Sequence, residues 1–167
     1  MATLGGSYLL YKLLPGPTQL VIERYLGVDK HSSPSSLLTY HLTNTSFMSV
    51  ATNLAILGTI GRYHYLTHGA GSFLTVTGCG ALGGSLATAN AVSKNEHYVA
   101  ASSNAIGAAL VTFHAFKTPK LFTQFRYLKF LPLGWVALMG IYGIKYGDEG
   151  VLAGAAGGYA AFLLGIW

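Results

Sequence analysis

Apolar residues occur in five long blocks separated by short polar segments, and this alternation constrains the fold of the chain more than any other feature. The blocks cover Phe47–Tyr65, Phe73–Val92, Val99–Phe116, Leu128–Ile144 and Val151–Trp167. Each block has about 17 to 20 residues, the length that a helix rising about 1.5 Å per residue needs to cross roughly 30 Å of hydrocarbon. We therefore predict an all-α fold, a polytopic membrane helical bundle with five to six transmembrane helices.

The charge content supports this fold class and excludes several kinds of site. Of the 167 residues, 51% are hydrophobic and 9% are charged, against roughly a quarter charged in ordinary soluble domains. The net charge is +5, but the cations are spread along the chain, so nucleic acid is not an expected partner. Cys79 is the single cysteine, which excludes an internal disulfide and a site of several thiolates. We expect no metal centre and no organic cofactor.

The chain divides into two parts. Residues 1–34 form an N-terminal segment, in which the apolar run Leu4–Leu14 is too short to cross a membrane and Thr18–Leu26 suits an amphipathic helix at its surface. An additional crossing by residues 4–26 stays open. No basic region precedes the first apolar run, so no cleavable secretory signal is expected. Residues 35–167 contain the five blocks and form the predicted bundle.

The charges at the block ends predict an orientation. With five crossings, one face carries five cations and no acidic residue, whereas the cations and carboxylates of the other face cancel. Because basic residues collect on the side that is not translocated, the first face is expected to be cytoplasm, matrix or stroma. Its cations are Arg62, Lys117, Lys120, Arg126 and Lys129.

Four of these cations lie in one segment that also contains aromatic residues. Lys117, Lys120, Arg126 and Lys129 alternate with Phe and Tyr side chains. This arrangement suits anionic lipid headgroups, and bound phospholipid such as cardiolipin is the expected ligand in a mitochondrial membrane. A plain anchor at the positive face explains the pattern equally well.

Small residues repeat on the last block. Gly150, Gly154 and Gly158 recur every four residues and therefore share one face of a helix. Glycine at this spacing permits close helix approach. The repeat predicts tight packing within one bundle, with contact to another chain as the alternative.

Polar residues follow a fixed spacing in the segment Leu37–Gly58. Its sequence begins LLTYHLTNTSFMSVATNLAIL, in which Thr39, Asn44, Ser49 and Asn53 are separated by five, five and four positions. The segment resembles the second transmembrane helix of the rhomboid family of intramembrane proteases. The resemblance implies that Thr39 and Asn53 retain family residues. It also implies that Asn44 and Ser49 occupy the positions of two family histidines.

Two later segments extend the resemblance. Ser102 aligns with the nucleophilic serine of the family, and Gly107 retains the small residue five positions further on, although both glycines that flank the family serine are replaced. In the last block, the register Gly154–Gly158 puts Ala155 at the position of the family's catalytic histidine. No histidine follows His114, so no other register supplies that base.

The degenerate positions imply an inactive protein. A serine hydroxyl is a poor nucleophile unless a neighbouring base removes its proton, so loss of the histidine removes the chemistry. The resemblance covers about residues 35–167 and indicates a rhomboid-like pseudoprotease that is not an enzyme. The family positions concerned are Asn44, Ser49, Asn53, Ser102 and Ala155, of which Asn53 and Ser102 keep the family residue.

One histidine pair lies outside these positions. His64 and His68 are four residues apart, so on a helix they share a face and could bind a metal ion or the edge of a haem. The alternative is that they are interfacial polar residues beside Tyr63 and Tyr65. The sequence supplies no obvious third ligand.

These observations predict a structural role. The leading hypothesis is a non-catalytic accessory subunit of a large membrane complex, a respiratory complex or the ATP synthase of the mitochondrial inner membrane, with other membrane subunits and anionic lipids as partners. The first alternative is a derlin-like or import-associated pseudoprotease that handles membrane-protein clients. The second is a residual intramembrane serine protease that uses Ser102.

Overall fold

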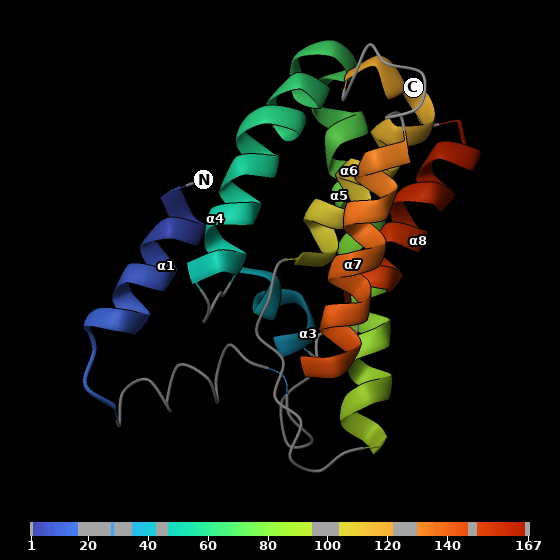
Figure 1. Ribbon diagram of the computed structural model, residues 1–167. Helices are drawn as coiled ribbons and strands as arrows, with labels where there is room; N and C mark the ends of the chain where they lie inside the picture. The colour runs from blue at the N-terminus through green and yellow to red at the C-terminus, as the bar shows by residue number, and fades with distance from the viewer. Residues whose placement is uncertain are drawn as a thin grey trace.

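The structure is a computed structural model that describes residues 2–16, 28, 35–42, 47–94, 104–121, 130–146 and 150–165. The secondary-structure elements of these residues are helices (Figure 1). In chain order they are α1 (Ala2–Leu13), α3 (Ser36–Thr39), a 3-10 turn (Tyr40–Leu42), α4 (Phe47–Ile56), a π-helical segment (Leu57–Gly61), α5 (Arg62–Lys94), α6 (Asn104–Lys117), a second 3-10 turn (Pro119–Leu121), α7 (Leu131–Tyr146) and α8 (Gly150–Leu163).

A glycine reverses the direction of α5. Gly69 has φ 80° and ψ 174°, a backbone conformation that residues with a Cβ rarely adopt. The residues before Gly69 continue the course of α4, and the residues after it run back along the bundle (Figure 1). The reversal therefore makes a helical hairpin out of α4 and α5.

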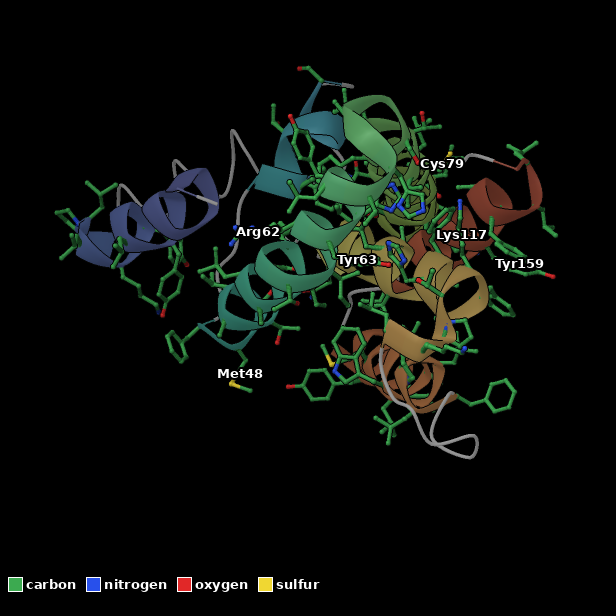
Figure 2. All side chains as sticks on the ribbon, turned by 90° about the horizontal axis from the view of Figure 1, so that it is seen from above. Met48, Arg62, Tyr63, Cys79, Lys117 and Tyr159 are labelled. Atoms are coloured by element: carbon green, nitrogen blue, oxygen red, sulfur yellow. The ribbon has the colours of Figure 1, made fainter. Side chains whose placement is uncertain are left out.

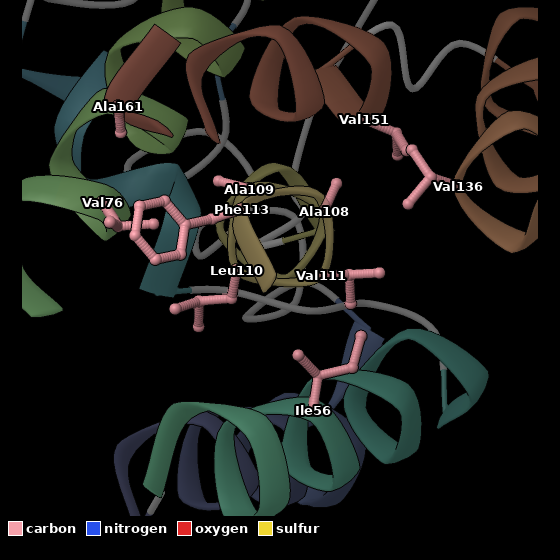
Figure 3. Close-up of a cluster of buried hydrophobic side chains, with 10 residues drawn as sticks. All are labelled: Ile56, Val76, Ala108, Ala109, Leu110, Val111, Phe113, Val136, Val151 and Ala161. Carbon is pink, nitrogen blue, oxygen red and sulfur yellow. The ribbon is translucent and has the colours of Figure 1, made fainter. Parts of the chain in front are cut away.

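Helix α6 is the centre of the bundle. The residues from Gly107 to Ala115 are all buried, and Figure 3 shows Ala109, Leu110 and Val111 pointing from α6 in different directions. Around them lie side chains from four other elements, among them Ile56 of α4 and Val136 of α7. A helix that is apolar on all sides is stable in water only when other helices cover it, and here α4, α5, α7 and α8 do so.

The N-terminal part packs on the edge of the bundle. Helix α1 lies beside α4, where the rings of Tyr8 and Phe47 are 6.2 Å apart. A small apolar cluster joins Val28 to Tyr40 and Val92. The amphipathic helix predicted at Thr18–Leu26 lies outside the described residues.

The predicted membrane-spanning architecture is wrong. The elements are helical, but no helix in the described part of the chain is both long and apolar enough to cross a membrane. Helices α6 and α8 have 14 residues and α7 has 16, or about 21 to 24 Å at a rise of about 1.5 Å per residue. Helix α5 has 33 residues, but it is interrupted at Gly69 and contains many polar side chains. The predictions of five to six transmembrane helices and of an integral membrane location therefore have no support in the described residues.

Candidate functional site

Two of the positions singled out by the resemblance to rhomboids, Ser49 and Asn53, meet the start of α6. Ser49 and Asn53 lie one turn apart on α4, and both reach Asn104, the first residue of α6. Ser49 Oγ donates a hydrogen bond of 2.8 Å to Asn104 Oδ1, and Asn53 Nδ2 donates one of 3.1 Å to the same oxygen. Asn53 is buried. Asn44 and Ser102 lie outside the described residues.

Gly107 explains how α4 and α6 come close enough for these bonds. A Cβ at Gly107 would lie 3.1 Å from Asn53 Oδ1 and 3.3 Å from Ile56 Cδ1. Both distances are tighter than ordinary van der Waals contacts, so the glycine leaves room for the asparagine. The amide cluster of Ser49, Asn53 and Asn104 therefore depends on a small residue one turn into α6.

The last helix, α8, packs through small residues, among them Ala155, which the resemblance aligned with the rhomboid base. Gly154 and Gly158 of α8 pack against the backbone of α6, at Ala105 and Ala109 respectively. Ala155 is half-buried and packs on the apolar core, and Gly150 is buried at the start of α8. The glycine face predicted from the sequence thus makes contacts within the chain.

None of the three described side chains of the amide cluster could activate a nucleophile. Hydroxyl and carboxamide groups donate and accept hydrogen bonds but do not take up a proton near neutral pH. Asn53, Ser49 and Asn104 instead hold α4 against α6 through buried polar contacts, which stabilise a unique packing when they are satisfied.

A second polar cluster, which the sequence did not predict, lies at the end of the bundle where α5 reverses. His64 Nδ1 and His114 Nε2 share a hydrogen bond of 2.9 Å. The other nitrogen of each ring is bonded to a hydroxyl: His64 Nε2 lies 2.9 Å from Ser72 Oγ, and His114 Nδ1 lies 2.7 Å from Thr118 Oγ1. We call these four residues the histidine chain.

The fold explains why the histidine chain forms. His64 precedes Gly69 and Ser72 follows it, so the reversal brings the two side chains together. His64 and His114 are both 0% exposed. His68 stacks on His64 with 4.8 Å between ring centroids. The cluster therefore fastens both halves of α5 to the end of α6.

Burial keeps the two central histidines neutral. Burial, with smaller contributions from neighbouring His68 and Lys117, lowers the pKa of His64 to about 4. Burial, with smaller contributions from His64, His68 and Lys117, lowers the pKa of His114 to about 3. A neutral imidazole has one N–H and one acceptor nitrogen, so the chain can be satisfied with all its hydrogen bonds running in one direction.

The order Ser72, His64, His114 is formally that of a nucleophile, a base and an orienting group. A base whose pKa is about 4 is a weak proton acceptor at neutral pH, and a neutral imidazole supplies no charge to stabilise it. The cluster therefore suits a structural role.

The sequence also raised metal binding by His64 and His68. Within the described ranges, no group of three His, Cys, Asp or Glu side chains could hold a metal ion.

The sequence could not have paired His64 with His114, because 50 positions separate them. The available signal was that His114 lies inside an apolar block, where a titratable side chain needs a partner. Ser72 gave no such signal, since its contact depends on the reversal at Gly69.

The predicted lipid-binding cations are only partly described. The ammonium of Lys117 lies 5.4 Å from the centroid of the Phe113 ring, a cation–π distance. Lys120 is exposed, and Arg126 and Lys129 lie outside the described residues. Figure 2 shows Arg62 on the side of α1 and Lys117 on the side of Tyr159, so these two cations are not neighbours.

The histidine chain predicts a pH dependence of stability. His64 and His114 bind fewer protons in the folded chain than in the unfolded chain, where their pKa is near 6.5. These two histidines should therefore leave stability unchanged between about pH 7 and 8 and lower it as the pH drops from about 6.5 toward 4, by up to about 1.4 kcal/mol per pH unit for each histidine. Urea unfolding followed by circular dichroism between pH 4 and 8 measures this, and a flat profile would contradict it.

Comparison with known proteins gives no relative: no protein family, curated protein or solved structure matches the chain.

Proposed function

We propose that this chain is a non-catalytic, rhomboid-like structural subunit of a larger complex, held there through the apolar outer faces of its helices. The observation that carries the proposal is the exposure of large apolar side chains on the longer helices outside α6, namely α1, α4, α5, α7 and α8. They include Phe47 of α4, Leu86 of α5, Leu138 of α7 and Leu163 of α8, each at least 60% exposed. Where exposed apolar side chains gather into a contiguous patch, they mark a site of association.

The degenerate positions support the non-catalytic part of the proposal. Ser49 and Asn53, which align with family positions, donate hydrogen bonds to Asn104, and none of these three side chains takes up a proton near neutral pH. Ala155 offers a methyl group at the position of the family's base. Of the aligned positions within the described residues, Ser49 and Asn53 therefore hold α4 against α6, and Ala155 packs on the apolar core.

Purification of the chain from its native cells under mild conditions tests the proposal. We expect one complex on a native gel, with the same partner subunits at fixed stoichiometry by mass spectrometry. Subunits of an energy-converting complex, a respiratory complex or ATP synthase, would identify the assembly. Mostly free chain with varied substoichiometric partners would overturn the proposal and favour the client-handling pseudoprotease.

Activity-based labelling tests the absence of catalysis. A fluorophosphonate probe should leave Ser102 unlabelled in the native complex, because the chain supplies no histidine beyond His114 to activate it. An active serine hydrolase in the same extract is the positive control. Covalent labelling that disappears in a Ser102→Ala variant would show a residual protease and contradict the proposal.

A further inference from the structure

The reversal of α5 at Gly69 is fastened to the bundle by few side chains. Residues 65–71 are exposed except for half-buried His68, and a Cβ at Gly69 would meet nothing within 4 Å. The buried residues that border this segment are His64 and Ser72, the two members of the histidine chain that α5 supplies. A segment with so few buried contacts opens more easily than the rest of a structure.

The hydrogen bond between the two histidines limits how many protons this end of the bundle can hold. With both rings neutral, one N–H lies between His64 Nδ1 and His114 Nε2, which are 2.9 Å apart. One added proton is tolerated at an outer nitrogen, because the hydroxyl of Ser72 or Thr118 turns from donor to acceptor. With a second proton both rings are imidazolium, and two N–H groups point at each other. The closed arrangement therefore has no place for two protons.

The charges around the pair also oppose a second proton. The described residues include no Asp or Glu. The ring centroids of His64 and His114 are 5.0 Å apart, and Lys117 of α6 acts on both rings as a further positive charge. Two buried imidazolium groups would be desolvated here and would repel each other.

The neighbouring elements supply no group that reverses this balance. Helix α4 and residues 131–141 of α7 contain no titratable side chain. The other titratable or cationic groups at this end of the bundle are Arg62, Tyr63, Tyr65 and His68 of α5, Lys120 of the turn after α6 and Tyr159 of α8 (Figure 2). Each of these groups is neutral or positive in mildly acidic solution.

We propose that the reversal of α5 is an acid-sensitive switch, in which protonation of both His64 and His114 releases residues 62–72 from the end of α6 while the rest of the bundle stays folded. In the open state both rings lie in water and take up a proton below about pH 6.5. In the closed state burial keeps both neutral until a much lower pH. The open state therefore binds about two protons more, and acid favours it.

The rest of the bundle is held by contacts that acid does not change. Gly154 and Gly158 of α8 pack against the backbone of α6, and Gly157 packs against the backbone of α5 at Cys79. No titratable side chain takes part in these contacts. The opening is therefore expected to stay local. It needs no partner subunit, so it is independent of the proposed function.

Hydrogen exchange of the full chain, followed by mass spectrometry between pH 4.5 and 7.5, tests the switch. Two turns of helix are not stable without packing, so the amides of residues 61–68 should exchange once released. After division by the intrinsic rate at each pH, their open fraction should rise by up to about a hundredfold per pH unit between about pH 5.5 and 4.5, since opening takes up one proton on each of two histidines. The open fraction of α8 should stay at least about tenfold lower at every pH.

A variant with one titrating group fewer checks the proton count. His114→Gln keeps an N–H and an acceptor at the end of the side chain but does not titrate, so the rise should fall to about tenfold per pH unit. The matched control is His68→Gln, which removes a histidine of the same end that lies outside the histidine chain. This control should keep the steeper rise.

Three results would overturn the switch. One is an open fraction of residues 61–68 that does not change with pH. Another is an equal open fraction in residues 61–68 and in α8 at every pH, which would mean that the chain only unfolds as a whole. Both are measured on the unmodified chain, so the test does not depend on whether His114→Gln folds. The third is a rise that is reduced in His68→Gln as much as in His114→Gln.

Discussion

Replacing Gly154 by alanine should destabilise the bundle by about 3 kcal/mol or more, the upper range for overpacking a core. The added Cβ would overlap the carbonyl oxygen of Ala105 on the central helix. A backbone atom cannot rotate away as a flexible side chain can, so α8 must shift along its whole contact with α6. Thermal unfolding of the purified chain by circular dichroism measures the effect.

The chain offers a matched control for this substitution. Gly134 of α7 is exposed, and a Cβ there would meet nothing within 4 Å. Alanine also has a better helix propensity than glycine, so Gly134→Ala should leave stability unchanged or raise it by up to about 1 kcal/mol. Equal effects of Gly134→Ala and Gly154→Ala would show that α8 does not pack on α6 through this face.

Breaking the histidine chain should have the second largest effect. In His114→Leu, Nδ1 of His64 loses its partner in a fully buried position, and leaving a buried polar atom unsatisfied adds about 1 to 3 kcal/mol to the cost of lost packing. His64→Leu should be similar, because it orphans His114 Nε2 and Ser72 Oγ. Urea unfolding at pH 7.5, where both imidazoles are neutral, gives the two free energies of unfolding.

The double variant separates the contact from general damage. Because His64→Leu with His114→Leu removes both partners of the bond, its cost should be less than the sum of the two single costs by about 1 to 3 kcal/mol. His68→Leu is the control for a histidine outside the chain of buried hydrogen bonds. The His68 ring stacks on His64, but its own hydrogen bond is to the adjacent, exposed Thr67. Its substitution should therefore cost less stability than either central substitution. Additive costs of the two central substitutions would mean that the bond does not contribute.

The sequence predicted the course of the helices well, because apolar periodicity and glycine spacing are local signals. The block Phe73–Val92 lies within the second half of α5, and Val151–Trp167 overlaps α8. The face shared by Gly154 and Gly158 is the one that packs on α6.

The hydropathy of the sequence does not distinguish a helix surrounded by protein from one surrounded by lipid. A helix that is apolar on all sides can be buried by protein or by lipid, and the two give the same sequence pattern. Here α6 is apolar all round because four neighbouring elements cover it, and its 14 residues are too few for a crossing. The membrane-spanning interpretation failed in part because the blocks Val99–Phe116 and Val151–Trp167 are longer than α6 and α8, which have 14 residues each.

The two polar clusters could not be predicted from the sequence for a different reason. Ser49 and Asn53 lie four residues apart, and their shared face was readable, but Asn104 joins them from 51 positions beyond Asn53. The partners of His64 likewise come from a chain reversal and from a distant helix. Pairing across such separations depends on the tertiary arrangement, which no local pattern encodes.

The central position of α6 also has a consequence for biosynthesis. Chains are made from the N-terminus, so α4, α5 and α6 leave the ribosome before α8, which begins about 30 residues after α6 ends. During that interval the side of α6 that later meets Gly154 and Gly158 has no cover. The nascent chain then exposes this apolar side of α6 to solvent. Molecular chaperones should bind it during that interval and release it once α8 has been synthesised.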